Sequence, residues 1–261
     1  MNCLIETALL THGLRSIANE ELAQSWHCPD AILAWVDGGE LKIGPIGEYL
    51  PFRERSEELI RIDCDHLEEA LQTGASGALT ASGTMAVCRR LDIPMAITCG
   101  MGGIGDLRGE ELCPDLPALM NIPVALISTS PKDMLDRPST LDWLRRHGVH
   151  TAGEPCTGYL FCGEPVALEL PLSSCNNEAA VRRLTANGGL LLLNPIPEKE
   201  RVQDRSILVD AIKAGKQAEA EGRYYHPAAN GEIDRRTGGY SSRIQLESIQ
   251  QNYLLAKSIM D

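Results

Sequence analysis

Short apolar segments alternate along this chain with segments in which apolar residues recur every three or four positions. The short ones are rich in aliphatic and β-branched residues, which favours buried strands, and the others have the period of amphipathic helices. The expected strands are Cys3–Leu10, Ala31–Val36, Leu41–Gly44, Pro94–Thr98, Val124–Ser128, Tyr159–Cys162 and Leu190–Leu193. The expected helices are Ala18–Trp26, His66–Thr73, Thr84–Leu91, Thr140–His147, Glu178–Ala186, Arg205–Gly222 and Ser241–Met260, with Arg223–Gly239 as a loop.

Strands that alternate with helices predict a mostly parallel central sheet with helices on both faces, which is a three-layer α/β/α fold. No stretch has the composition of a linker and no segment repeats, so we expect residues 1–261 to form a single domain. Ligands of such sheets bind at the carboxyl ends of the strands. The residues that directly follow the strand segments are therefore the first candidates for a functional site.

Charge and cysteine usage narrow the class of protein. The formal net charge is −12, which argues against a nucleic-acid duplex as ligand but leaves room for a phosphorylated small molecule. The N-terminal segment lacks the features of a signal peptide, and no apolar run approaches the ~20 residues of a membrane span. The nine cysteines contain no Cys-x-x-Cys pair and indicate a reducing compartment. We expect a soluble cytoplasmic protein.

A glycine-rich segment follows the expected strand Pro94–Thr98. Its pattern Gly100-x-Gly102-x-x-Gly105 matches the fingerprint of a dinucleotide site, but the next expected strand does not end in the acidic residue that would bind the ribose. A loop that lets backbone amides approach a polar substrate is the other interpretation.

Lys132 stands just past the expected strand Val124–Ser128, in Ser130-Pro131-Lys132-Asp133. The simple interpretation is a solvated surface lysine. The functional one is an amine in a cleft, whose lowered pKa lets it attack a carbonyl carbon.

Glu6 lies within the apolar run Leu4–Leu10, where an unpaired carboxylate is costly to bury. The structural interpretation is an edge position or a buried ion pair. The functional interpretation is a carboxyl group with a raised pKa that is suited to acid–base catalysis.

Several segments together resemble the pseudouridine-5′-phosphate glycosidase family, also called the indigoidine synthase A-like family. They are Glu6–Gly13 (Glu-Thr-Ala-Leu-Leu-Thr-His-Gly), Ser82–Met85, Gly102–Ile104, Pro131–Asp136, Thr140–Leu144 and Asn194–Glu198. Their order and spacing match over nearly the whole chain. The resemblance implies an α/β/α enzyme that reversibly joins uracil and ribose 5-phosphate through a C–C glycosidic bond, assembles as a homotrimer and uses a divalent metal, typically manganese.

The resemblance also implies roles for individual residues. Lys132 would form an imine with C1′ of the opened ribose, and Glu6 would transfer protons. A C–C bond has no heteroatom leaving group, so the two-carboxylate mechanism of ordinary glycosidases does not apply and an imine supplies the electron sink. The remaining matches are the substrate-binding residues Arg61, Thr80, Ala81, Cys113, Asp115 and Asn252, and the metal ligand Glu111.

The departures from the family pattern gather around the phosphate and the metal. Arg61 replaces a phosphate-binding lysine, Glu111 replaces a metal-binding aspartate, and Cys113-Pro114-Asp115 replaces Ser-Ala-Asp. Schiff-base chemistry on a somewhat different substrate fits this pattern. The alternatives are a synthase that joins another ring to a pentose phosphate, a dinucleotide-dependent oxidoreductase, and a non-catalytic relative.

Overall fold

The computed structural model describes residues 2–105, 113–186, 188–223 and 225–260. One large sheet has the strand order β10-β11-β8-β6-β1-β2-β5-β4, with β3 paired to β2. Its strands are β1 (Cys3–Ile5), β2 (Leu33–Asp37), β3 (Glu40–Gly44), β4 (Ile60–Ile62), β5 (Gly77–Leu79), β6 (Met95–Ile97), β8 (Ala125–Ser128), β10 (His150–Gly153) and β11 (Leu190–Leu193). Two pairs, β2–β3 and β2–β5, are antiparallel and the others are parallel.

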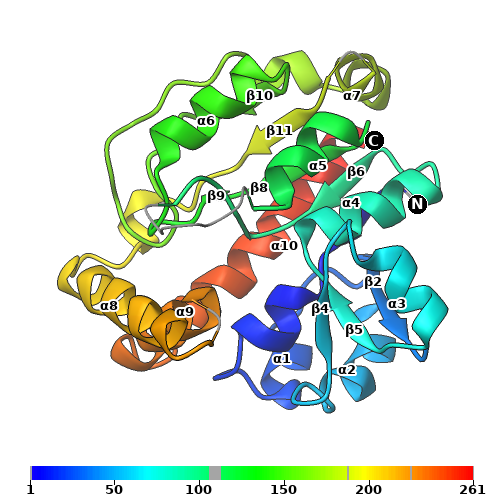
Figure 1. Ribbon diagram of the computed structural model, residues 1–261. Helices are drawn as coiled ribbons and strands as arrows, with labels where there is room; N and C mark the ends of the chain where they lie inside the picture. The colour runs from blue at the N-terminus through cyan, green and yellow to red at the C-terminus, as the bar shows by residue number, and fades with distance from the viewer. Residues whose placement is uncertain (1, 106–112, 187, 224, 261) are drawn as a thin grey trace.

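Helices cover both faces of this sheet (Figure 1). They are α1 (Asn19–Ser25), α2 (Ile46–Arg53), α3 (Leu67–Thr73), α4 (Ala81–Arg90), α5 (Asp115–Asn121), α6 (Arg137–Arg146), α7 (Glu178–Thr185), α8 (Ser206–Ala220), α9 (Tyr225–Arg236) and α10 (Tyr240–Met260). The predicted three-layer α/β/α fold with a mostly parallel sheet is confirmed. The single domain stays a prediction. Among the described residues, no helix has the length and apolar character needed to cross a membrane.

Two apolar cores lie on opposite faces of the sheet because successive strand residues point to opposite sides. In β1, Cys3 and Ile5 belong to the core that α10 covers, whereas Leu4 belongs to the core that α3, α4, α5 and α6 cover. Leu190 and Leu192 of β11 face the first core, and Leu191 and Leu193 face the second. A strand buried on both faces reads as a continuous apolar run, which is why Leu190–Leu193 was predictable.

The carboxyl ends of two oppositely directed groups of strands meet beside β1. β6, β8 and β11 run parallel to β1, whereas β5 and β4 run the other way because β5 is antiparallel to β2. Thr7 joins the two groups: its backbone N–H donates to Leu79 O (3.1 Å), and its hydroxyl donates to Ala34 O (2.8 Å) and accepts from Leu79 N (2.9 Å). Residues that follow β1, β5 and β6 therefore converge.

The expected strand Cys3–Leu10 is wrong beyond Ile5. A π-helical turn, η1 (Leu9–Gly13), follows β1 instead. The buried guanidinium of Arg53 stabilises the carbonyls around it, because its Nε donates to Leu10 O (2.6 Å) and its Nη2 donates to Leu14 O and Ile17 O (2.8 Å each). Turns of this kind are frequent at functional sites.

Two further expectations differ from the structure. Tyr159–Cys162 is not a strand; Phe161 makes only an isolated bridge with Val202. The expected loop Arg223–Gly239 contains the helix α9, and α8 and α9 form a hairpin near one end of α10 (Figure 1). Pro227 does not prevent this helix because it lies in the first turn, where a backbone N–H has no intrahelical partner.

Candidate active site

Glu6 is the first residue after β1 and lies between the two groups of strands. Its side chain is buried, and its Oε1 accepts a 2.7 Å hydrogen bond from the hydroxyl of Thr98, which directly follows β6. Burial raises the pKa of the Glu6 carboxyl to about 7, although the Thr98 hydroxyl opposes the rise. A carboxyl group with this pKa exchanges protons readily near neutral pH, as an acid–base catalyst must.

Lys132 is half-buried and follows β9 (Ser130–Pro131), which pairs with β7 (Gly100–Met101). Its backbone N–H donates to Met101 O at 3.2 Å. It makes no ion pair or side-chain hydrogen bond with any residue that the structure describes. Burial lowers the pKa of its amine, the nearby Arg61 lowers that pKa further, and the charges of Glu6 and Asp115 act in the opposite direction. The amine is therefore biased toward its neutral, nucleophilic form.

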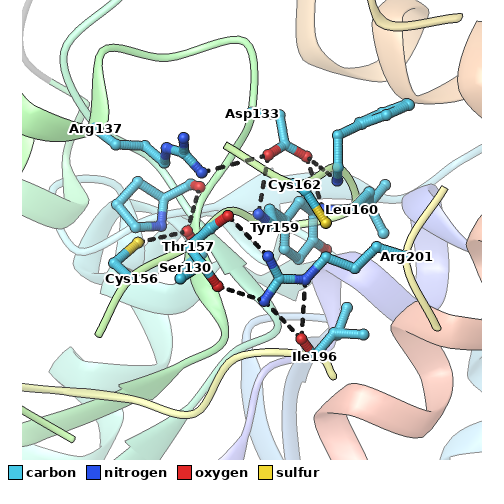
Figure 2. Close-up of polar contacts among 12 residues, drawn as sticks. Ser130, Asp133, Arg137, Cys156, Thr157, Tyr159, Leu160, Cys162, Ile196 and Arg201 are labelled. Carbon is cyan, nitrogen blue, oxygen red and sulfur yellow. Dashed lines mark hydrogen bonds and ion pairs between the residues drawn. The ribbon is translucent and has the colours of Figure 1, made fainter. Parts of the chain in front are cut away.

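The segment that follows the lysine is anchored through the next residue, Asp133 (Figure 2). The Asp133 carboxylate accepts hydrogen bonds from the backbone N–H groups of Tyr159 (2.9 Å), Leu160 (2.7 Å) and Phe161 (3.0 Å). Arg137 forms an ion pair with the same carboxylate at 3.9 Å. These contacts hold the backbone on the carboxyl side of Lys132 to a loop distant in sequence.

Arg201 fixes that loop from its other side (Figure 2). Its guanidinium is buried and donates to Ile196 O from Nε (2.9 Å) and Nη2 (2.6 Å), to Thr157 O from Nη1 (2.8 Å) and to Thr157 Oγ1 from Nη2 (2.9 Å). The loop Asn194–Pro197 after β11 is thereby tied to the segment that binds Asp133.

Arg61 and Asp115 are the other charged groups near the pair. Arg61, on β4, is exposed and makes no ion pair with a described residue, although its charge influences the pKa of Glu6, Lys132 and His12. Asp115 is buried, and its carboxylate accepts from Ser82 N (3.1 Å) and Gly102 N (2.8 Å). Asp115 therefore fixes the glycine loop to the start of α4.

Thr80 caps α4, with its hydroxyl accepting from Gly83 N at 3.3 Å, and Ala81 is the buried first residue of that helix. Cys113 is half-buried, and burial raises the pKa of its thiol to about 12. Its Sγ would lie 2.0 Å from a Cβ at position 102, so only glycine fits there. Substrate binding by Thr80, Ala81, Cys113 and Asp115 stays a prediction.

Gly100 and Gly103 of this loop are also closely packed. A Cβ at Gly100 would lie 2.6 Å from the ring of Tyr159, and one at Gly103 would lie 2.6 Å from Thr140 Oγ1. Side-chain packing accounts for these three glycines without a bound dinucleotide.

Asn252, on α10, is fully buried and satisfied within the protein. Its Nδ2 donates to Thr98 O (2.7 Å) and to Thr129 Oγ1 (3.2 Å), and its Oδ1 accepts from Asn194 Nδ2 (3.0 Å). It therefore connects three residues that follow strands, including the partner of Glu6. Contact between Asn252 and a substrate stays a prediction.

A metal site is not visible in the described part of the chain. Glu111, the predicted ligand, lies in segment 106–112, outside the described residues. No three His, Cys, Asp or Glu side chains gather as a ligand set within the ranges that the structure describes, and the Asp115 oxygens already accept backbone N–H groups. The described residues alone do not fit a metal. Manganese stays a prediction, as does the trimer.

Sequence reasoning missed Thr98 and His226. Thr98 is an ordinary strand-end threonine in the sequence, but its position after β6 was a usable signal. His226 was assigned to a loop. It lies on α9, where the charges of Lys132 and Arg61 act on it, and burial lowers the pKa of its imidazole to about 3.

A family model described as indigoidine synthase A like protein matches residues 4–260. The chain belongs to this family. The resemblance seen in the sequence is thus confirmed, and with it the expectation of an enzyme.

Curated relatives in this indigoidine synthase A-like family are named pseudouridine-5′-phosphate glycosidase. The protein of Methylobacterium nodulans is 28% identical to this chain, with 98% of this chain and 81% of the relative covered. The Escherichia coli protein is 26% identical, with coverages of 98% and 88%.

Two solved structures share the fold with a TM-score of 0.77. One is the prealnumycin C-glycosynthase AlnA in complex with ribulose 5-phosphate, 23% identical, with 98% of this chain and 91% of that chain covered. The other is an indigoidine synthase A-like protein of Thermotoga maritima, 20% identical with the same coverages.

Proposed function

We propose that this protein catalyses reversible cleavage of the C–C glycosidic bond between a heterocyclic base and ribose 5-phosphate, with pseudouridine 5′-phosphate or a close C-ribonucleotide as substrate. The curated relatives named for this substrate support the substrate class. The observation that carries the mechanism is Lys132, an amine of lowered pKa without an ion pair in the described structure, near the protonatable carboxyl of Glu6.

In the first step the neutral Lys132 amine attacks C1′. The new Nζ–C1′ bond replaces the C1′–O4′ bond, and the Glu6 carboxyl gives its proton to O4′, so the sugar ring opens. Glu6 is then a carboxylate and takes up the proton that the attacking nitrogen must lose. Both tasks require a carboxyl pKa near neutrality, which burial provides here.

In the second step the proton on Glu6 passes to the base carbon that is bonded to C1′. The C1′–C bond breaks, its electron pair stays with the base ring, and the nitrogen lone pair forms the C1′=N bond. Water then adds to the imine and releases ribose 5-phosphate and free Lys132. The sum is one C-nucleotide and one water converted to base and pentose phosphate; the reverse sequence forms the bond.

Arg61 is the proposed phosphate site. Its guanidinium is exposed and makes no ion pair with a described residue. Its positive charge lowers the pKa of both Lys132 and Glu6. A guanidinium binds a phosphate through paired donors.

Borohydride trapping with ribose 5-phosphate and with pseudouridine 5′-phosphate, followed by peptide mapping, tests the mechanism. We expect a stable adduct on Lys132, none in Lys132→Arg, and slower cleavage of pseudouridine 5′-phosphate in Glu6→Gln. Lys42→Arg is the matched control, since Lys42 is solvated and paired with Glu40. An adduct mapped to another lysine, or none with either compound, would refute the proposal.

A further inference from the structure

Two elements beside Lys132 and Arg61 present buried polar atoms that have no hydrogen-bond partner in the described structure. These atoms are Nε2 of His12 on η1, and Nδ1 of His226 and Oδ1 of Asn230 on α9. The two elements pack against each other. A buried polar atom left without a partner destabilises the fold, so three of them around one site point to a polar ligand.

His226 and Asn230 act from one face of α9, because residues four apart on a helix are neighbours. The charges of Lys132 and Arg61 both act on His226, and Lys132 has the larger effect. The imidazole therefore lies near the predicted imine lysine and within range of the proposed phosphate cation. A pentose phosphate bound by both cations would place its hydroxyl groups between them.

The chemistry of the unpartnered atoms favours a hydroxyl group over the phosphate. The amide oxygen of Asn230 is an acceptor and needs a donor, which a phosphate dianion lacks and a hydroxyl provides. Burial and the two cations lower the pKa of His226 to about 3, so its ring is neutral and presents one donor and one acceptor nitrogen. A neutral imidazole and a carboxamide can match a hydroxyl, which both donates and accepts.

We propose that His226 and Asn230 bind the C2 hydroxyl of the open-chain sugar and so select ribose 5-phosphate over its 2-deoxy analogue. This inference rests on the proposed imine at Lys132, because that bond fixes C1 and places C2 beside α9. It assigns to α9 a role in specificity that is separate from the chemical step.

The test measures the concentration of ribose 5-phosphate, and of 2-deoxyribose 5-phosphate, that half-saturates borohydride trapping on Lys132. The wild-type protein should prefer ribose 5-phosphate. His226→Phe and Asn230→Leu should each weaken ribose 5-phosphate binding roughly fivefold, the effect of one neutral hydrogen bond, and leave the deoxy compound unchanged. Asn230→Asp keeps an acceptor oxygen and should retain more of the preference than Asn230→Leu.

His147→Phe is the matched control, because His147 stacks on Trp143 at the exposed end of α6, with ring centroids 3.8 Å apart. Equal trapping of both sugars by the wild type, or an unchanged preference in folded His226→Phe and Asn230→Leu, would overturn the inference while leaving the proposed function intact; the atoms would then bind water only. No adduct on Lys132 with either sugar would overturn both proposals.

Discussion

The hydroxyl of Thr98 donates a 2.7 Å hydrogen bond to the carboxyl group of Glu6, where both side chains are buried. The bond joins the ends of two adjacent parallel strands, β1 and β6. A hydroxyl donor favours the ionised carboxylate, whereas burial favours the protonated form. Burial is the larger of the two effects, and the pKa of Glu6 rises to about 7.

Thr98→Val should therefore raise the pKa of Glu6 further. In the proposed mechanism Glu6 must carry a proton, so kcat/KM falls as the pH rises through this pKa. The valine variant should move that alkaline limb to higher pH by up to about one unit, which corresponds to about 1.4 kcal/mol. Thr98→Ser keeps the hydroxyl and should leave the limb in place. If the alkaline limb of kcat/KM stays at the same pH in Thr98→Val, the limb reports the titration of a group other than Glu6.

Glu6→Gln should abolish a loss of stability that the wild-type protein shows as the pH rises. The pKa of Glu6 rises from 4.5 to about 7 on folding, so the native state binds the proton more tightly than the unfolded chain does. The contribution of this tighter proton binding to the free energy of unfolding is complete below pH 4.5 and is lost as the pH rises through about 7. Relative to Glu6→Gln, the wild type should therefore lose roughly 3 kcal/mol of unfolding free energy between pH 4.5 and pH 8. Urea titrations of both proteins across this window measure the difference; parallel curves would contradict a buried, protonatable Glu6.

Asp133→Ala should reduce both stability and the rate of imine trapping. The substitution leaves three backbone N–H groups without their acceptor and releases the segment beside Lys132, so we expect a loss of about 2–4 kcal/mol and trapping slowed roughly tenfold. Denaturant unfolding and single-turnover trapping give the two values. Asp142→Asn, at an exposed ion pair with Arg146, should change neither by much. Trapping at the wild-type rate would show that the anchor is not needed for the chemistry.

Arg201→Lys should destabilise the protein although it conserves the charge. A lysine cannot reproduce four hydrogen bonds directed at Thr157 and Ile196, and its ammonium would stay buried without an acid, so roughly 2–4 kcal/mol should be lost. Arg89→Lys on the exposed end of α4 provides the comparison, with a change expected within about 0.5 kcal/mol. Equal stability of the two variants would contradict the role of the guanidinium.

The sequence predicted the layers of the fold because buried strands and amphipathic helices leave strong periodic patterns. It placed Glu6 inside a strand because Leu4–Leu10 is mostly apolar, and a run of this kind does not show where extended backbone becomes a π-turn. The side-chain contact that stabilises the turn at Leu10 comes from Arg53, 43 residues away in the sequence. Lys132 was identified at the end of a strand, but the loop that anchors it through Asp133 was mistaken for a strand.

The largest miss was α9. Glycine, proline and two tyrosines in Arg223–Gly239 resemble a loop, and no local pattern shows that α8 provides a packing surface for them. As a result His226 and Asn230 went unnoticed. The role of these two residues depends on their neighbours in the folded protein, Lys132 and Arg61, and only the tertiary structure brings these residues together.

The place of α10 in the chain has a consequence for folding during synthesis. This helix covers β1, β6 and β8, yet every strand of the large sheet is translated before it. A nascent chain that has emerged through β11 can pair the strands while the apolar face with Ile5, Ile97 and Ile127 still faces water. The same helix also supplies Asn252, which binds the backbone of Thr98. Protection of this apolar face from aggregation and completion of the site therefore occur in one event, the docking of α10.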